Sequence, residues 1–284
     1  MDETSLRRYV RWLADQRVTG LAVNVDTGEG PHLSGEERVR VLEVVAEEVG
    51  DRTLIVAGLA GSFTDQAARL AVDAASAGAR ALLVFPLPVY QGEPLDPEVP
   101  VRYHRAVHEA SGLPLIVFQL QPALGGVNFS PEVLERLMTV DGVVAIKEAS
   151  FDAKRFVETL RAVRAVAPEA VVLNGNDNFL LEAYLLGADG ALLGFGTLAA
   201  RQQVEMLEAV LARDLDRAGS LAGVLQPLCD AIFAPPVRDY RARVKHALAT
   251  LGVIDHASVR PPLLPLSPDE AAGVERALKE AALT

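Results

Sequence analysis

This chain is poor in cysteine, in long apolar runs and in positive charge. Its one cysteine, Cys229, excludes an intramolecular disulfide and a cysteine-rich metal site. No apolar run reaches the length of about 18 residues that a membrane-spanning helix needs, and the N-terminus lacks the apolar segment of a signal peptide. We therefore expect a cytoplasmic protein without a membrane partner, in which Cys229 is an inert side chain of a buried helix.

Basic residues number 27 against 38 aspartates and glutamates, which gives a net charge of −11. A nucleic-acid partner is therefore not expected, because such binding needs clustered lysine and arginine. The sequence also lacks a Ser-His-Asp arrangement, a phosphate-binding loop and a dinucleotide-binding glycine pattern, and no cofactor is expected. Lysine is so rare that one placed in a strand is informative; the chain has only Lys147, Lys154, Lys245 and Lys279.

Seven short apolar runs, rich in Val, Leu and Ile, alternate with stretches of helical periodicity. Each run is hydrophobic throughout, as expected for parallel strands that are buried on both faces. Ser34, Thr64 and Ser130 are predicted helix N-caps, and glycines at 50, 78, 112 and 187 are predicted C-caps. The predicted strands cover residues 20–26, 53–60, 81–86, 114–120, 143–149, 170–174 and 190–194.

A strand–helix repeat of about thirty residues is compatible with an open doubly wound sheet or with a closed (β/α)8, or TIM, barrel. No low-complexity linker divides the repeats, which favours one barrel domain over residues 1–221. Residues 222–284 are predicted to form a C-terminal helical region packed on the barrel, with a proline-rich joint at VRPPLLPLSP. Only seven strands are counted, whereas such a barrel needs eight.

Lys147 lies near the end of the fifth predicted strand and is followed by Glu148. Active sites of α/β barrels form at this end of the strands, and burial there lowers the pKa of an amine. A neutral amine can attack a ketone and form a Schiff base. Alternatively, Lys147 extends from the strand end into water or pairs with Glu148. Its position alone does not choose between these interpretations.

Two loops at other strand ends contain small and polar residues. The segment NVDTGEG, residues 24–30, could bind a carboxylate through backbone N–H groups and the Thr27 hydroxyl, or be an ordinary glycine turn. In LNGNDN, residues 173–178, Gly175 could allow a ligand to approach the backbone, or simply form a turn. His104 and His108 lie four residues apart, but HRAVH lacks the glutamate of a zinc-protease helix. We expect them on a solvated helix face and predict no metal site.

Four segments, in order, resemble the dihydrodipicolinate synthase/N-acetylneuraminate lyase family of Schiff-base aldolases. They are GLAVNVDTGEGPHLSGEER, VVAIKEAS, VVLNGNDNFLLEAYLLGADGALLG and VRPPLLPLSPDE. The resemblance implies that Lys147 forms the imine and that Asp26, Thr27 and Gly28 line the pocket for the carboxylate of a 2-oxo acid. It places Gly175 and Leu192 near the bound keto acid, and implies a homodimer or homotetramer.

Several residues depart from the family pattern. The catalytic tyrosine on the strand before the lysine strand is matched by Phe118, which has no hydroxyl. The loop tyrosine that the family lends across a dimer interface is absent from residues 85–88, although Tyr90 is close. Asp26 stands where the family has a threonine, and its carboxylate would repel a 2-oxo acid. The tentative acid–base groups are therefore Tyr90, Asp26 or an ordered water.

These departures argue against the lysine-biosynthesis reaction of a typical dihydrodipicolinate synthase. The resemblance then implies a lyase of the aldolase, dehydratase or hydratase-aldolase type, acting on pyruvate or a pyruvate-derived sugar acid. Phe118 either lines an apolar substrate pocket, as in family members that accept hydrophobic aldehydes, or fills the barrel core. The alternative is a catalytically impaired relative that binds a 2-oxo acid as a sensor or partner subunit.

The resemblance also bears on the strand count. Members of the family begin with a strand before the helix that corresponds to residues 6–15. The first barrel strand is thus expected upstream of Met1, in roughly twenty further residues. If Met1 is the true start, the barrel has an open seam with two unpaired strand edges, which another segment or a partner would have to cover.

Overall fold

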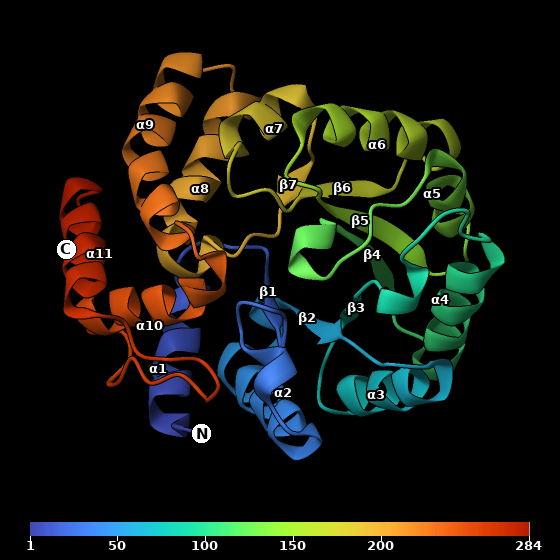
Figure 1. Ribbon diagram of the computed structural model, residues 1–284, viewed down its shortest axis with the longest axis horizontal. Helices are drawn as coiled ribbons and strands as arrows, with labels where there is room; N and C mark the ends of the chain where they lie inside the picture. The colour runs from blue at the N-terminus through green and yellow to red at the C-terminus, as the bar shows by residue number, and fades with distance from the viewer. Residues whose placement is uncertain (284) are drawn as a thin grey trace. The chain divides into compact units, whose positions relative to one another are not determined.

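The central feature of the computed structural model, which describes residues 1–283, is a sheet of seven parallel strands. Each strand pairs with the next one along the chain, and the sheet curls into a half-barrel (Figure 1). All seven predicted runs contain a strand, so the count made from the sequence is confirmed. The strands are β1 (Gly20–Val23), β2 (Leu54–Leu59), β3 (Ala81–Val84), β4 (Leu115–Leu120), β5 (Val143–Ala149), β6 (Val171–Asn174) and β7 (Gly190–Ala191).

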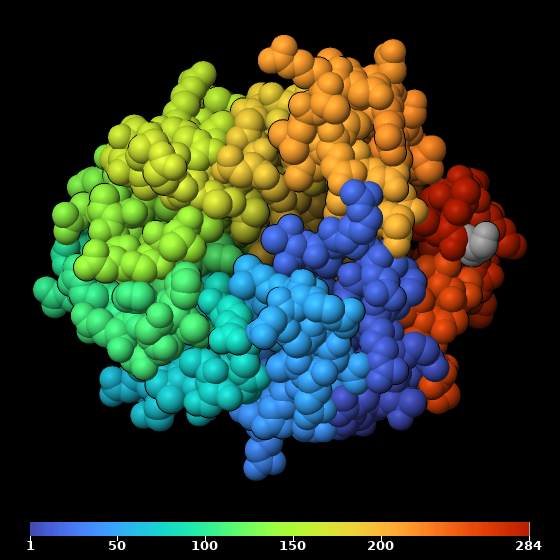
Figure 2. All heavy atoms as spheres, turned by 180° about the vertical axis from the view of Figure 1, so that it is seen from behind, coloured from blue at the N-terminus to red at the C-terminus, as the bar shows by residue number. Residues whose placement is uncertain are grey.

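The strands belong to a compact unit of residues 20–46 and 54–192. Helices follow the strands in alternation and lie along the outer side of the sheet (Figure 1). Seen from behind, the green to yellow-green part of the chain, which includes α4 to α6, packs into a continuous outer surface (Figure 2). The helices are α2 (Gly35–Val49), whose last turn extends beyond this unit, α3 (Thr64–Ser76), α4 (Glu98–Ser111), α5 (Pro131–Met138), α6 (Ala153–Val166) and α7 (Leu180–Leu186).

Two of the three predicted N-caps are confirmed. The Ser34 Oγ accepts a hydrogen bond from the Glu37 backbone N, and the Glu37 carboxylate accepts one from Ser34 N. Ser130 caps α5 through the N–H of Val133. The prediction for Thr64 is wrong, because Thr64 is already the first residue of α3. The predicted C-cap glycines 50, 78, 112 and 187 all have positive φ and follow helix ends.

The inner side of the sheet is filled with apolar side chains, as the continuous hydrophobicity of the runs predicts. In β3 all four residues are buried, on the inner and the outer face alike. The inner cluster positions the site described below. Its buried members are Val25, Val56, Ala81, Leu83, Ile116, Phe118, Ala145 and Ala149, with Ala22, Phe85, Leu120, Phe151, Leu173 and Leu192 packed against them.

His104 is not on a solvated helix face, so the prediction made from its spacing to His108 is wrong. Its side chain is 1% exposed, and its Nδ1 lies 2.8 Å from the Pro100 carbonyl oxygen. Burial lowers the pKa of His104 to about 4. His108 is half-buried, with Nδ1 2.9 Å from the Leu113 oxygen. Because α4 packs closely against α3, its buried face is wider than the apolar spacing suggests.

A second compact unit comprises residues 1–19, 47–53 and, of the described chain, 193–283. The prediction of helices after residue 222 is confirmed, and Cys229 is a buried residue of α9, as expected. The proposed domain boundary between residues 221 and 222 stays a prediction. The helices of this unit are α1 (Glu3–Ala14), α8 (Gly196–Leu211), α9 (Leu215–Ile232), α10 (Tyr240–Thr250) and α11 (Pro268–Glu280).

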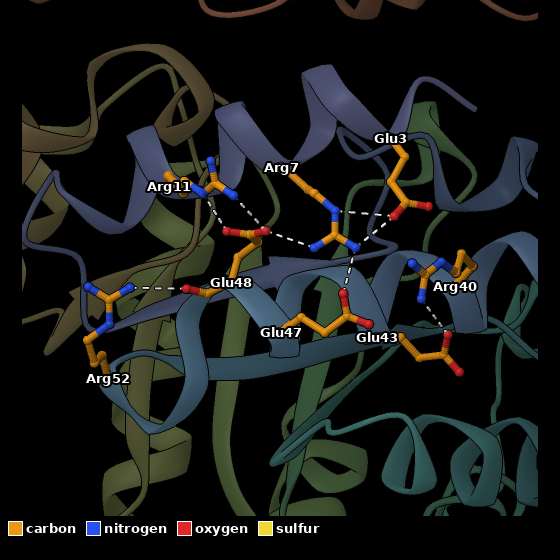
Figure 3. A network of polar contacts seen from close by, with 8 residues as sticks. All are labelled: Glu3, Arg7, Arg11, Arg40, Glu43, Glu47, Glu48 and Arg52. Atoms are coloured by element: carbon orange, nitrogen blue, oxygen red, sulfur yellow. Dashed lines mark hydrogen bonds and ion pairs between the residues drawn. The ribbon is translucent and has the colours of Figure 1, made fainter.

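An ion-pair network joins α1 to the last turn of α2 (Figure 3). The Arg7 guanidinium contacts Glu47 at 2.6 Å and Glu48 at 2.8 Å, and also pairs with Glu3. Arg11 donates to the same Glu48 carboxylate at 3.0 Å. The Glu48 side chain is only 10% exposed, and the hydrogen bonds from Arg11 and Arg7 lower its pKa.

Among residues 1–283, no single helix has the length and apolar character to cross a membrane. Only α9 taken together with residues 237–250 passes that test, and these two segments are bent by 102° relative to one another. The cytoplasmic location stays a prediction.

Candidate active site

Lys147 lies on the inner side of the sheet, two residues before the end of β5. In register it stands between Phe118 on β4 and Leu173 on β6, which both belong to the inner cluster. Its Nζ is 4.3 Å from the centroid of the Phe118 ring. Although the side chain keeps partial exposure, its amine lies over the ring of an inner-cluster residue. The interpretation that Lys147 extends outward from the strand end into water is therefore wrong.

Opposing effects set the charge of this amine. Burial, the largest, lowers the pKa of Lys147 to about 8, although the carboxylates of Asp177 and Asp26 raise it. The face of the Phe118 ring also favours the charged form. With a pKa of about 8, about one amine in ten is neutral at pH 7, compared with about three in ten thousand for an ordinary lysine. A much larger share of Lys147 than of a surface lysine is therefore neutral at pH 7.

Glu148 does not pair with Lys147, so that alternative is also wrong. Adjacent residues of a strand point to opposite faces of the sheet, and Glu148 is fully buried on the outer side. Its carboxylate accepts hydrogen bonds from Gln119 Nε2 at 3.1 Å and from Asn176 Nδ2 at 2.7 Å. The backbone N–H of Ser150 donates a third, at 3.1 Å.

Gly175 follows β6 and lies directly against the lysine side chain. A Cβ at this position would be 2.7 Å from Lys147 Cε and 3.0 Å from the Glu148 carbonyl oxygen. The Gly175 N–H also donates a short hydrogen bond, 2.6 Å, to that oxygen. The close approach that the sequence suggested at Gly175 is therefore an approach to Lys147 itself.

The predicted anion-binding loop follows β1 as a tight turn. The N–H groups of Glu29 and Gly30 donate to the carbonyl oxygens of Asp26 and Val25, at 3.1 and 3.0 Å. Gly30 is required by contact, because a Cβ there would lie 1.9 Å from the Asn24 oxygen. Asp26 and Thr27 are half-buried and Gly28 is exposed. Of this loop, Asp26 is the residue whose charge acts on Lys147.

An apolar wall borders the amine. The rings of Phe85 and Phe118 meet edge to face, with centroids 5.0 Å apart. Leu192, just after β7, packs against the same cluster, and its N–H donates to the Asn174 carbonyl oxygen at 2.9 Å. The structure thus places Phe118 and Gly175 against Lys147, and Leu192 against the cluster that contains Phe118.

Tyr90 is a buried residue of the same unit. It is 2% exposed, and its ring neighbours are Tyr103 on α4, at 6.3 Å, and Phe129, at 6.2 Å. Burial raises the pKa of the Tyr90 hydroxyl. Tyr90 thus belongs to an aromatic cluster with Tyr103 and Phe129, whereas the ring that contacts the amine is that of Phe118.

Asp177 is the site residue that the analysis of the sequence missed. It is 7% exposed, and its carboxylate is the larger of the two charges that raise the pKa of Lys147. The available clue was a carboxylate two residues after Gly175, at the C-terminal end of a parallel strand. Within residues 1–283, no group of three or more His, Cys, Asp or Glu side chains is arranged to hold a metal ion.

Comparisons with known proteins show which family this chain resembles. The model of the dihydrodipicolinate synthetase family matches residues 1–281. A 4-hydroxy-tetrahydrodipicolinate synthase of Rhodopseudomonas palustris (strain BisA53) is 30% identical over 283 residues, covering 100% of this chain and 92% of the relative. N-acetylneuraminate lyase 2 of Escherichia coli O6:H1 is 29% identical over 266 residues, covering 94% and 84%.

Solved structures agree over the whole chain. A monomeric dihydrodipicolinate synthase variant superposes with a TM-score of 0.91 at 27% identity, covering 100% of this chain and 92% of that one. The chloride-inhibited dihydrodipicolinate synthase of Acinetobacter baumannii, complexed with pyruvate, superposes with a TM-score of 0.87 at 29% identity, covering 100% and 94%.

Proposed function

This chain belongs to the dihydrodipicolinate synthetase family, and we propose that it is a lyase that binds a 2-oxo acid as an imine on Lys147. Its relatives include synthases and an N-acetylneuraminate lyase. The observation that carries the proposal is the place of Lys147 on the inner side of the sheet, against Phe118 and Gly175, where burial lowers its pKa to about 8. The related enzyme complexed with pyruvate supports pyruvate, or a pyruvate-derived sugar acid, as the 2-oxo acid.

In the proposed reaction the neutral Nζ of Lys147 attacks the ketone carbon, and the ketone oxygen takes up a proton. The carbinolamine then loses water, which leaves a protonated imine. The imine accepts the electron pair released when a neighbouring C–H or C–C bond breaks, and an enamine forms. Proton transfers in these steps need a group near the nitrogen. Asp177 and Asp26 are the carboxylates with a charge effect on Lys147, and we propose them for this role in place of Tyr90.

The carboxylate of the 2-oxo acid is proposed to bind at the turn after β1, through the backbone N–H groups of Thr27 and Gly28 and the hydroxyl of Thr27. Asp26 would repel a second anion, so the substrate carboxylate has to lie on the Thr27 side. Gly175 and Leu192 are proposed to border the keto acid, as the family resemblance implies. Both residues lie beside Lys147 or its cluster.

Phe118 and Phe85 support a proposal about the second reactant. Phe118 stands where the family has a tyrosine, and its ring without a hydroxyl makes this side of the amine apolar. An aldehyde with an apolar substituent fits such a wall better than a charged one, because a buried charge without a partner is costly. We therefore propose a divergent family member rather than a typical dihydrodipicolinate synthase.

Reduction with borohydride in the presence of pyruvate tests the imine directly. The adduct should appear by mass spectrometry on the peptide that contains Lys147 and be absent from the Lys147→Arg variant. Labelling that is confined to Lys154, Lys245 or Lys279, or no labelling with any small 2-oxo acid, would contradict the proposal. An adduct on Lys147 without turnover over a panel of aldehydes would instead identify a binding protein.

We also propose that the chain forms a homodimer or homotetramer, although one structural relative is a monomeric variant. Light scattering coupled to gel filtration should then give two or four times the chain mass of 30.3 kDa. A single mass of 30.3 kDa at micromolar concentration would contradict it.

A further inference from the structure

Behind Lys147, on the outer side of the sheet, lies a buried polar network centred on Glu148. Its carboxylate and three partner side chains are all buried: Gln119 and Asn176 are 0% exposed and Thr159 on α6 is 2% exposed. Gln119 Nε2 donates both to Glu148 and, at 3.0 Å, to Thr159 Oγ1. Burial of so many polar groups is tolerated only because the partners satisfy one another.

A carboxylate suits this position chemically. An ionised carboxylate only accepts hydrogen bonds, and all three groups that reach Glu148 are N–H donors. A glutamine of the same shape would turn an NH2 group toward one of these donors. The three donors therefore favour an acidic side chain at position 148, where an apolar residue could have served for packing alone.

Asn176 carries the network to the loop after β6. Its Nδ2 bonds the Glu148 carboxylate, the Glu148 carbonyl oxygen at 3.0 Å and Asn174 Oδ1 at 2.8 Å. Its Oδ1 accepts from Phe151 N at 2.6 Å. Every polar atom of the Asn176 side chain is thus tied to β5, β6 or the residues that follow them.

Asn176 stands between two residues that act on Lys147. Gly175 lies against Lys147 Cε, and Asp177 is the carboxylate with the larger charge effect on the amine. The other, Asp26, comes from the loop after β1. The hydrogen bond between the Glu148 carboxylate and Asn176 is thus one of the contacts that hold the 175–177 turn beside the amine.

We propose that Glu148 is a positioning residue: from the outer face of β5 it holds Asn176, and through Asn176 it keeps Gly175 against Lys147 and fixes the position of Asp177. Its influence on catalysis rests on the function proposed above. Its influence on the amine does not, because the positions of Gly175 and Asp177 are independent of any substrate. Glu148 itself touches no reacting atom.

The rarity of lysine makes the amine directly observable. Protein grown with [ε-13C]lysine has only four lysine signals, and Lys147→Arg identifies the one from Lys147. In the wild type this signal should titrate near pH 8. In Glu148→Gln the turn is released, Asp177 moves from the amine, and the pKa of Lys147 should fall by about 0.5 or more.

Asn176→Ala removes the same link at its other end and should shift the pKa of Lys147 in the same direction. It decides the question if Glu148→Gln does not fold. Thr159→Val is the matched control, since it removes a buried hydrogen bond of the same network without touching Asn176. Its Lys147 signal should titrate as in the wild type, even if the variant is less stable.

An unchanged Lys147 titration in the folded Glu148→Gln and Asn176→Ala variants would overturn the proposal, as would an equal shift in Thr159→Val. The titration uses no substrate, and it therefore stays separate from the imine test. If the wild type forms no pyruvate adduct but the titrations behave as expected, the proposed function fails and the positioning role of Glu148 holds.

Discussion

At the residue scale, the reactivity of Lys147 depends on a balance between burial and neighbouring charge. Burial alone would make the amine more neutral than it is, and the carboxylates of Asp177 and Asp26 restore part of its charge. The Phe118 ring adds no proton-transfer group but touches the amine face-on. Under the proposed function, these carboxylates take the role of the hydroxyl that the family resemblance implies.

The first prediction concerns pH. The rate of imine trapping should rise between pH 7 and pH 9, with a midpoint of about 8, because the neutral amine reacts. In Asp177→Asn the midpoint should move to lower pH, since a charge that raises the pKa of Lys147 is lost. The midpoint of the borohydride-trapping profile is the measurement. A midpoint near that of an ordinary lysine, about 10.4, would show that the amine is not buried.

A second prediction concerns Gly175→Ala. The added methyl group would overlap Lys147 Cε and press on backbone at Glu148. We expect at least a tenfold loss of trapped adduct and a loss of about 1–3 kcal/mol in unfolding free energy. Gly35→Ala is the control, because a Cβ there meets no atom within 4 Å. Equal adduct yields in the two variants would contradict the close approach.

At the scale of elements, α1 is held by charge to the last turn of α2. Glu48 bridges Arg7 and Arg11, whereas Glu43, one turn earlier, pairs with Arg40 of its own helix (Figure 3). The Glu48 side chain is sheltered at 10% exposure, but that of Glu43 is 45% exposed. Exposed pairs contribute little to stability because water and salt screen them.

We therefore predict that Glu48→Gln lowers the unfolding free energy by about 1 kcal/mol, equivalent to roughly 2 °C in Tm. Glu43→Gln should stay within about 0.5 kcal/mol of the wild type. Differential scanning fluorimetry at low and high salt measures both, and high salt should narrow the difference. If the two variants lose the same stability, the bridge does not hold α1.

At the scale of the whole molecule, acid stability is sensitive to one buried histidine. His104 has its pKa lowered by burial to about 4, from an ordinary value of 6.5. Between these values the unfolded chain binds a proton at His104 and the folded chain does not. The contribution of His104 to the unfolding free energy is therefore complete above pH 6.5, and it is lost as the pH falls from 6.5 through 4.

His104→Asn should reduce the slope of unfolding free energy against pH by up to about 1.4 kcal/mol per pH unit inside that window. The substitution can keep an N–H donor toward the Pro100 oxygen. Urea denaturation at pH 7, 6 and 5 measures the slope in both proteins. Other groups titrate alike in the two, so parallel curves would mean that His104 is protonated in the folded state.

Much of the fold follows from local patterns, and these were predictable. Seven apolar runs became seven parallel strands, Ser34 and Ser130 cap their helices, and Cys229 is buried in a helix. The failures at this level came from packing. Thr64 lies one residue inside α3, and His104 is buried because α4 packs against α3, which spacing along one helix cannot reveal.

That Lys147 lies near the C-terminal end of a buried parallel strand could be read from the sequence, because hydrophobic continuity and strand length are local properties. The surroundings of the amine depend on how the chain folds. Asp177 approaches from the loop after the next strand, Glu148 turns to the opposite face, and Tyr90 packs against α4. These are contacts between segments distant in the chain, and the pairing of strands and the packing of helices set them.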